Sequence, residues 1–433
     1  MFGRSTMAFR GFEGPAGSGK TYHLMEAVSQ RLQQNPLLPH QKILSLTFMH
    51  GSRRRLDAEF RTNEVLRGKA VAMTIDSFAH NVWHRWRSLA GTLNAEIGDF
   101  NQTCDACGIL LEQDAVARWV ARSYPILVVD EAQELATPRL RMISALENYC
   151  AVFVAADEFQ CLDEDLDTAP FMEWFATGEI TLLNRIHRTN RAALLTAGAN
   201  LRQLTAPGQG PGLRVTYEWP NMMPFKVASA IRQAQGTVAV LYPPGGSAWA
   251  QSLSLRLAQG LHSAAYNFPP IYLAHEPRAA DEIDTVMDAL GDIEGAVFQD
   301  VISRMAPIAD PPLWLAKVRN SLRAGFDRFG KTNWSAEEVR SLLERTAANH
   351  RAYSRDRSRG IPLLSIHQAK NRQYDQIIIL WPHGVPGNDE FKARLLYNGI
   401  TRARRGCKIF VRAEELLHAA PFTFAPPVLA VNA

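Results

Sequence analysis

The chain has 433 residues, of which 46% are hydrophobic and 21% are charged, and its formal net charge is +4. This composition is typical of a globular protein with roughly two to three domains, and it excludes disordered and fibrous chains. The small positive charge permits a nucleic-acid partner without requiring one, so local clusters must decide that question. No apolar run is long enough to cross a bilayer and the N-terminus lacks a secretory apolar core, so we expect a cytoplasmic protein with no membrane partner.

The first predicted element is a Gly-rich loop, GPAGSGKT, at residues 14–21. Its spacing is the full P-loop pattern, in which successive backbone N–H groups face the phosphates of a nucleoside triphosphate. We expect Lys20 to reach the β- and γ-phosphates and the Thr21 hydroxyl to hold Mg²⁺. The next residues predict a helix whose positive end faces the anion. The predicted nucleotide-binding residues here are Gly14, Pro15, Ala16, Gly17, Ser18, Gly19, Lys20 and Thr21.

Apolar, β-rich runs recur along the chain and alternate with helical stretches. Their continuous hydrophobicity predicts parallel strands that are covered on both faces. We therefore predict an α/β fold with two consecutive blocks, residues 1–180 and 181–433, and small helical insertions at about 84–123 and about 278–358. The predicted strands are residues 42–48, 70–75, 126–130, 151–155, 237–242, 270–273, 363–366, 376–380 and 408–411.

The cysteines do not predict a disulfide framework, because there are five of them in a long chain. Cys104 and Cys107 form half of a possible zinc site. No second pair follows at a matching spacing, and His80 and His84 are only loose candidates. We expect ordinary thiols at these two positions.

The apolar strand predicted at 126–130 ends in two acidic residues, Asp130 and Glu131. A buried strand that ends in this way delivers carboxylates beside the phosphates of a P-loop. We expect Asp130 to bind Mg²⁺ together with Thr21, and Glu131 to orient and deprotonate the attacking water. The predicted cofactors are ATP and Mg²⁺.

The sequence around these acids, DEAQE at 130–134 and ADEFQ at 156–160, resembles motifs II and III of the UvrD/Rep-type superfamily 1 DNA helicases. Further stretches resemble the remaining family motifs in the right order and over nearly the whole chain. They are LSLTFMHGSRRRL (44–56), TIDSFAHNVW (74–83), LLNRIHRTN (182–190), SIHQAKNRQYDQIII (365–379) and LLYNGITRARR (395–405). The resemblance implies two tandem RecA-like domains with ATP in the cleft between them, and 3′→5′ movement along DNA.

The resemblance also implies roles for individual residues. Arg188 and Arg402 occupy the arginine-finger positions, and Gln160 occupies that of the γ-phosphate sensor. His187 replaces a base-stacking tyrosine, and Gln373 replaces a nucleotide-binding glutamate. The implied catalytic residues are Lys20, Glu131, Gln160, Arg188 and Arg402. The positions implied to contact DNA are Thr47, Phe48, His50, Ser77, His367 and Lys370.

The segment that follows Gln160 departs from the family pattern. Asp163 and Asp165 stand where relatives have a tyrosine and a tryptophan that stack on bases. Acidic side chains cannot stack, and they repel a phosphate backbone. Trp174 and Phe175 are nearby substitutes, although we expect them to pack in the core. The basic run SRRR at 52–55 fits either a DNA contact or a solvated helix face.

Two functions fit these observations. The first is an ATP-dependent helicase or translocase on single-stranded DNA or a tailed duplex. The second is a nucleotide-gated DNA-binding regulatory subunit of a nuclease or defence complex, without unwinding activity. The chain resembles the trimmed helicase-like subunits of antiphage systems such as the Gabija pair, and this resemblance implies a nuclease partner subunit and an antiviral role.

Overall fold

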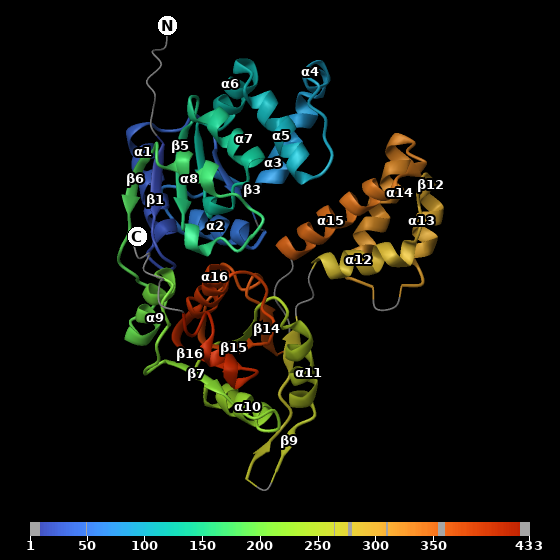
Figure 1. The fold of residues 1–433 in the computed structure, drawn as a ribbon. Helices are drawn as coiled ribbons and strands as arrows, with labels where there is room; N and C mark the ends of the chain where they lie inside the picture. The colour runs from blue at the N-terminus through green and yellow to red at the C-terminus, as the bar shows by residue number, and fades with distance from the viewer. Residues whose placement is uncertain are drawn as a thin grey trace, which may run out of the picture. The chain divides into compact units, whose positions relative to one another are not determined.

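The computed structural model of the chain describes residues 9–48, 50–263, 265–275, 279–308, 311–353 and 360–424. They form two compact units, of which the smaller spans residues 276–357 and the larger contains the rest. The larger unit holds two α/β lobes, each built around a six-stranded sheet with helices on both faces (Figure 1).

The first lobe contains a parallel sheet with the strand order β3-β2-β4-β5-β1-β6. Its strands are β1 (Arg10–Glu13), β2 (Ile43–Thr47), β3 (Ala70–Thr74), β4 (Ile126–Val129), β5 (Ala151–Ala156) and β6 (Glu179–Leu182). Every residue of β2 and β4 is buried. Strands in the middle of a doubly covered parallel sheet need apolar side chains on both faces, which explains their continuous hydrophobicity.

Helices cover both faces of this sheet. They are α1 (Lys20–Gln34), α2 (His50–Thr62), α3 (Ile75–Arg85), α4 (Arg87–Thr92), α5 (Phe100–Leu111), α6 (Asp114–Ser123), α7 (Thr137–Glu147) and α8 (Ala169–Phe175), with 3₁₀ turns η1 (Ala132–Glu134) and η2 (Glu158–Gln160). Successive strand residues point to opposite faces. Val128 of β4 accordingly packs with α1 and α2, whereas Val129 packs with the cluster that includes α3, α5 and α7.

The second lobe contains a parallel sheet with the strand order β11-β14-β8-β15-β16-β7. Its strands are β7 (Leu213–Tyr217), β8 (Val238–Tyr242), β11 (Leu273–His275), β14 (Ile361–Ser365), β15 (Tyr374–Trp381) and β16 (Ala403–Val411). Its helices are α9 (Ala192–Arg202), α10 (Met223–Gln233), α11 (Ser247–Ala258) and α16 (Asp389–Ile400), with 3₁₀ turn η3 (Glu414–His418) and the hairpin β9 (Leu261–His262) and β10 (Asn267–Phe268). Ile377 faces α9 and α16, and Ile378 faces α10 and α11.

The smaller unit is mainly helical. It consists of α12 (Ala279–Leu290), α13 (Phe298–Met305), α14 (Leu315–Phe329) and α15 (Ala336–Tyr353), with an antiparallel pair of short strands, β12 (Ala296–Val297) and β13 (Asn333–Trp334). Apolar side chains on one face of each helix meet in its core, including the buried Trp314, Val318 and Leu343. The amphipathic pattern of these helices therefore closes a core of their own.

The predicted α/β class with two parallel sheets is confirmed, and the architecture is that of two tandem RecA-like domains. Each predicted strand overlaps an observed one. The strands β1, β6 and β7 were not predicted, because they combine polar with apolar residues. Residue 181, where the second block was predicted to begin, lies inside β6 of the first sheet. We therefore propose a domain boundary just after Leu182.

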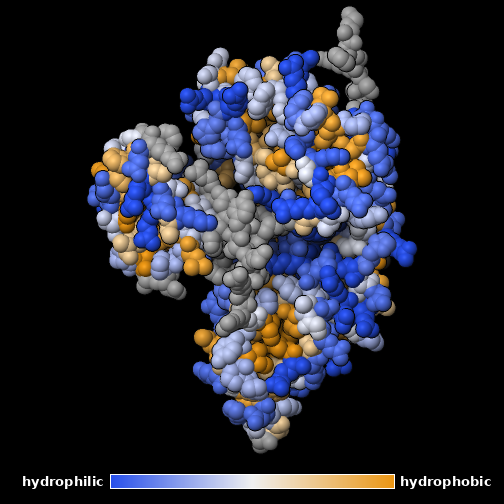
Figure 2. Space-filling view, turned by 180° about the vertical axis from the view of Figure 1, so that it is seen from behind, coloured by the Kyte–Doolittle hydropathy of each residue, from blue (hydrophilic) through white to orange (hydrophobic). Residues whose placement is uncertain are grey.

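Hydrophilic side chains dominate the molecular face seen in Figure 2, and hydrophobic side chains gather in patches on both α/β lobes. Scattered exposed hydrophobic residues are normal in globular proteins. Among the described residues, no helix has both the length and the apolar character needed to cross a membrane.

Candidate active site

The Gly-rich loop connects the carboxyl end of β1 to the start of α1. Gly17 and Gly19 have φ angles of +84° and +88°, in the region that favours glycine. A Cβ atom at Gly17 would also lie 2.6 Å from the Cβ atom of Arg188. The buried Lys20 Nζ donates a hydrogen bond to the Gly14 carbonyl oxygen at 2.7 Å. The loop thus has the backbone freedom and the adjoining helix N-terminus that a phosphate cradle needs.

Two oxygen ligands suited to a hard cation lie beside this loop. Thr21 Oγ1 donates a hydrogen bond to Asp130 Oδ2 at 3.1 Å, and both residues are buried. Hydroxyl and carboxylate oxygens are ligands that Mg²⁺ prefers. The donor set therefore fits the predicted metal, and Thr21 and Asp130 are the residues that would hold it.

Glu131 follows directly after Asp130 in an unusual backbone conformation. Its φ angle is +59°, which for a non-glycine residue costs about 1–3 kcal/mol and is concentrated at functional sites. Gln133 Nε2 donates a hydrogen bond to Glu131 Oε2 at 2.7 Å and so orients the carboxylate. Because of this φ angle, the extended conformation of β4 does not continue at Glu131.

The two acids have opposite pKa shifts. Burial and the neighbouring Glu131 charge raise the pKa of Asp130, and Arg55 and Lys20 only partly offset this. Burial also acts to raise the pKa of Glu131, but Lys20, the Gln133 amide and Lys370 outweigh it, so its pKa is lowered. Glu131 is therefore the better stabilised carboxylate, and a cation at Asp130 would reverse the shift there.

Asp157, at the carboxyl end of β5, joins the two lobes. Its side chain is fully buried. Asp157 Oδ1 lies 2.6 Å from Arg202 Nη1 in α9, and its Oδ2 lies 3.7 Å from Lys20 Nζ. Gln160 Nε2 donates a hydrogen bond to the same Oδ2 at 2.7 Å. A buried carboxylate needs such partners, and one of them comes from the second lobe.

Tyr397 of α16 makes a second link between the lobes. Its hydroxyl accepts a hydrogen bond from the Ala16 N–H group at 2.8 Å and donates one to Asp157 Oδ2 at 3.3 Å. The side chain is almost completely buried. Burial and the Asp157 charge raise the pKa of Tyr397, so it remains a neutral phenol.

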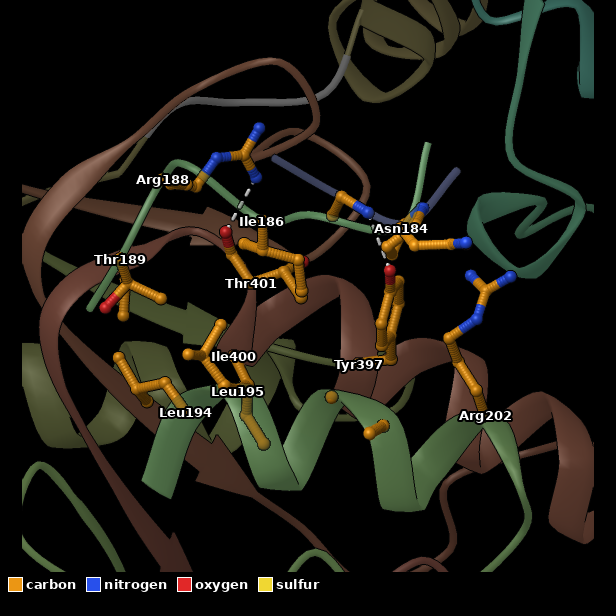
Figure 3. Close-up of a pocket in the computed structure, with 15 residues that line it drawn as sticks. Asn184, Ile186, Arg188, Thr189, Leu194, Leu195, Arg202, Tyr397, Ile400 and Thr401 are labelled. Atoms are coloured by element: carbon orange, nitrogen blue, oxygen red, sulfur yellow. Dashed lines mark hydrogen bonds between the residues drawn. The ribbon is translucent and has the colours of Figure 1, made fainter. Parts of the chain in front are cut away.

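The two predicted arginine fingers, Arg188 and Arg402, lie close to Tyr397. Arg402, only 3% exposed, donates from Nη2 to Gln160 Oε1 at 3.1 Å and from Nε to the Asn398 carbonyl oxygen at 3.0 Å. Arg188 donates from Nη1 to the Thr401 carbonyl oxygen at 2.7 Å (Figure 3). Burial and the nearby Arg402 charge lower the pKa of Arg188 to about 9, so the side chain stays cationic at neutral pH.

Two buried hydrogen-bond donors here have no partner among the described residues. They are Ser18 Oγ in the loop and Arg188 Nε. Unpaired buried polar groups are uncommon and call for an explanation. Phosphate oxygens, which accept several hydrogen bonds, suit both atoms, so the residues present fit a nucleotide.

A cavity of about 180 Å³ lies between the P-loop, residues 184–189 and helices α9 and α16 (Figure 3). Its lining is largely apolar and includes Ile186, Leu194, Leu195 and Ile400. Arg188 and Arg202 also line the cavity, where Arg188 donates to the Thr401 carbonyl oxygen and Arg202 pairs with Asp157. We propose that the phosphates bind to the N–H groups of the loop, on the side where Lys20 and Thr21 lie.

A larger cleft, of about 580 Å³, brings together three residues predicted to contact DNA: Phe48, His367 and Lys370. His367 Nε2 lies 3.3 Å from the Leu162 carbonyl oxygen, and Lys370 Nζ forms an ion pair with Glu134. Asp163, Glu164 and Asp165 line the same cleft. The cleft therefore combines the predicted contact residues with a concentration of negative charge.

The other residues predicted to contact DNA do not line this cleft. Thr47 is fully buried in β2, and Ser77 is exposed near the start of α3, where its hydroxyl accepts a hydrogen bond from Thr74 Oγ1 at 2.7 Å. The side chain of His50 lies outside the described residues. Trp174 and Phe175 pack in the first core, where Trp174 stacks on Phe9.

Two further residues, His187 and Gln373, were predicted to contact the nucleotide, and they lie in different surroundings. The His187 N–H group donates a hydrogen bond to the Gly17 carbonyl oxygen at 2.8 Å, so His187 lies beside the loop. Gln373 Oε1 accepts a hydrogen bond from Arg404 Nη2 at 3.0 Å at an exposed position. Within the described residues, the hydrogen bonds to the Gln373 amide oxygen therefore come from Arg404 and not from the loop.

The cysteine pair lies buried in α5. Burial raises the pKa of Cys104 to about 12, and burial also raises that of Cys107. Among the described residues, no cluster of three or more His, Cys, Asp or Glu side chains could hold a metal ion. His80 and His84 contact each other, with their Nε2 atoms 2.8 Å apart.

Sequence reasoning missed four residues of this site. Asp157 and Tyr397 lie within motifs that were matched, so those motifs contained the signal. Arg202 and Arg55 lie in helices α9 and α2, and Arg55 Nη2 donates a hydrogen bond to Thr21 Oγ1 at 3.3 Å. The signal for Arg55 was the basic run at 52–55, which lies within the matched stretch 44–56.

Two family models match the chain. An AAA domain matches residues 6–164, and a UvrD-like helicase C-terminal domain matches residues 361–409. The two matches support the resemblance to UvrD-like helicases that the motifs predicted. The first match contains the P-loop and both acids, and the second contains motif V, so the two matches support a helicase-type ATPase that uses a nucleotide.

Among solved structures, the chain is similar to an Arterivirus helicase, nonstructural protein 10. The complex of that protein with DNA has 10% identity and a TM-score of 0.37, with 94% of this chain and 61% of that chain covered. A second structure of the same helicase has 10% identity and a TM-score of 0.38, with 96% and 62% covered. The chain thus spans about three fifths of the length of this helicase. No curated protein matches the chain.

Proposed function

We propose that the chain is an ATP-hydrolysing motor that moves along single-stranded DNA, with its nucleotide site between the two α/β lobes. The observation that carries this proposal is a set of buried side chains beside the P-loop, to which both lobes contribute. Lys20 of the first lobe, Arg402 of the second and the connecting Gln160 lie within one set of buried contacts. A phosphoryl group carries negative charge during its transfer, and cationic side chains from both lobes would stabilise that charge.

The first lobe would bind the nucleotide and activate water. Lys20 would contact the β- and γ-phosphates, and Thr21 and Asp130 would hold Mg²⁺, which supplies charge neutralisation at the phosphates when bound. Glu131, kept as a carboxylate by its neighbours, would orient and deprotonate the attacking water. Each of these side chains is at the carboxyl end of a parallel strand or at the helix that follows it.

The second lobe would complete the site and sense its state. Arg188 and Arg402 would stabilise negative charge on the transferring group. Gln160 donates to Asp157 and accepts from Arg402, so a change at its amide alters contacts in both lobes. Hydrolysis could thereby shift the lobes against each other and move a bound strand.

The nucleic acid would cross the cleft that contains Phe48, His367 and Lys370. An aromatic ring offers a stacking surface to any base, and a lysine offers charge to the backbone. The predicted 3′→5′ direction and the choice of DNA rest on the motif resemblance.

A second candidate function is a nucleotide-gated DNA-binding subunit that does not unwind. Asp163 and Asp165, which line the cleft in place of stacking aromatic residues, favour this function. Each stacked base contributes about 1–3 kcal/mol, so their absence weakens the grip that strand separation needs. The predicted nuclease partner, antiviral role and cytoplasmic location stay predictions.

Strand displacement distinguishes the two functions. The protein would be incubated with ATP and Mg²⁺ and either a 3′-tailed or a 5′-tailed duplex, and hydrolysis would be measured with and without single-stranded DNA. Displacement of the 3′-tailed duplex alone supports the motor. Hydrolysis stimulated by single strands without displacement supports the gated subunit, and an absence of stimulated hydrolysis contradicts both.

A further inference from the structure

Arg55 of α2 reaches the predicted metal-binding side of the nucleotide site. Its Nη2 donates a hydrogen bond to Thr21 Oγ1 at 3.3 Å, and its Nη1 lies 3.5 Å from Asn371 Oδ1 in the second lobe. The side chain is partly buried. A basic run on a surface helix would ordinarily be solvated, so this inward position requires its own explanation.

The charge of Arg55 acts on Asp130 and on both predicted arginine fingers. It lowers the pKa of Asp130, whose largest shifts come from burial and Glu131. It also lowers the pKa values of Arg188 and Arg402, for both of which burial is the first cause. Arg55, Arg188 and Arg402 therefore share one electrostatic environment, in which the positive charges repel one another.

Two of the acids near this group already have cationic partners, and a third, Asp130, accepts a hydrogen bond from Thr21 and would hold Mg²⁺. Asp157 pairs with Arg202 and lies near Lys20, and Glu134 pairs with Lys370. The hydrogen-bond acceptors of Arg55 given above are neutral, a hydroxyl and an amide oxygen. Within the described ranges, no carboxylate forms an ion pair with Arg55. A guanidinium in such a position favours an additional anion, and its planar fork suits phosphate oxygens.

We propose that Arg55 is a third arginine of the nucleotide site and contacts the γ-phosphate of ATP. Oxygen atoms bound to one Mg²⁺ lie about 3 Å apart, because each is about 2.1 Å from the ion. A group within hydrogen-bond distance of Thr21 Oγ1 can therefore reach a phosphate oxygen that shares that ion. The first lobe then distinguishes ATP from ADP through a residue of its own. This inference rests on the proposed function, namely that the site takes ATP.

The matched control is on the same helix. Arg61 pairs with Asp57 at 2.6 Å, and its side chain is 75% exposed. Arg61→Ala removes a guanidinium from α2 without touching the site. Arg55→Ala removes the charge and the side chain, whereas Arg55→Gln keeps a hydrogen-bond donor without the charge, and thermal unfolding would check that each variant folds.

The test is a fluorescence titration of the full chain with labelled ADP and with a labelled non-hydrolysable ATP analogue, both with Mg²⁺. Arg55→Ala and Arg55→Gln should weaken binding of the analogue about ten- to hundredfold, as expected for a hydrogen bond between charged groups, with ADP affinity nearly unchanged. Arg61→Ala should bind both nucleotides like the wild type.

Two results would overturn the inference while leaving the proposed function intact. One is unchanged affinity for the analogue in both Arg55 variants. The other is an equal loss for ADP and the analogue, which would mean that Arg55 only supports Thr21. If the wild type bound neither nucleotide, the proposed function would be overturned and the inference with it.

Discussion

Replacement of Arg202 by alanine should lower the free energy of unfolding by about 2–3 kcal/mol, because it leaves a buried carboxylate short of its partner. Asp157 is 0% exposed, and Arg202 Nη1 lies 2.6 Å from its Oδ1. Breaking a buried ion pair costs about 3–5 kcal/mol when one charge is left uncompensated. The Arg202 side chain is 31% exposed and Lys20 still lies 3.7 Å from Asp157, so water and Lys20 offset part of that cost.

Urea unfolding followed by tryptophan fluorescence would measure this change. Arg61→Ala is the matched control, because Arg61 lies at the same distance of 2.6 Å from Asp57 but both side chains are exposed. It should cost less than about 0.5 kcal/mol. The double variant Arg202→Ala with Asp157→Asn should recover part of the loss. Equal costs for Arg202→Ala and Arg61→Ala would refute the reasoning, since burial would then make no difference.

Three further variants test individual roles. Lys20→Ala should abolish ATP hydrolysis and weaken nucleotide binding, as measured by phosphate release and titration, and normal turnover would contradict the phosphate assignment. Glu131→Gln should reduce turnover at least about hundredfold while the protein still binds ATP and single-stranded DNA. Lost ATP affinity would instead indicate a binding role for Glu131. Asp163→Tyr with Asp165→Trp should tighten single-strand binding in an anisotropy titration by about tenfold or more. Unchanged affinity would mean that the strand does not pass this loop.

The fold could be predicted largely because its central strands carry a strong local signal. Strands β2 and β4 are buried on both faces, so nearly every residue is apolar and the run stands out. The edge strand β6 has exposed residues at both ends, and β1 begins at the exposed Arg10 and ends at Glu13. The pairing of β6 with β1 joins residues far apart in the chain, and no local pattern reports it.

The residues of the candidate site likewise divide into those that the sequence predicts and those that only the structure reveals. Spacing alone identified Lys20 and Thr21, because the P-loop is contiguous in sequence. Asp130 and Glu131 followed from the end of an apolar strand. The inward position of Arg55 and the pairing of Arg202 with Asp157 depend on how helices α2 and α9 pack, which a basic side chain on a predicted helix does not reveal. The acidic lining at Asp163 and Asp165 was visible in the sequence, but its place in the cleft with Lys370 required the structure.

The central claim is that a cation from the second lobe assists chemistry on a nucleotide held by the first. Measuring turnover and nucleotide affinity together for Arg402→Ala tests it most directly, with Arg402→Lys and a thermal unfolding curve as controls for this buried position. We predict that turnover falls at least about hundredfold while affinity for a non-hydrolysable ATP analogue changes less than about threefold. Unchanged turnover, or turnover and affinity that fall by the same factor, would contradict the account.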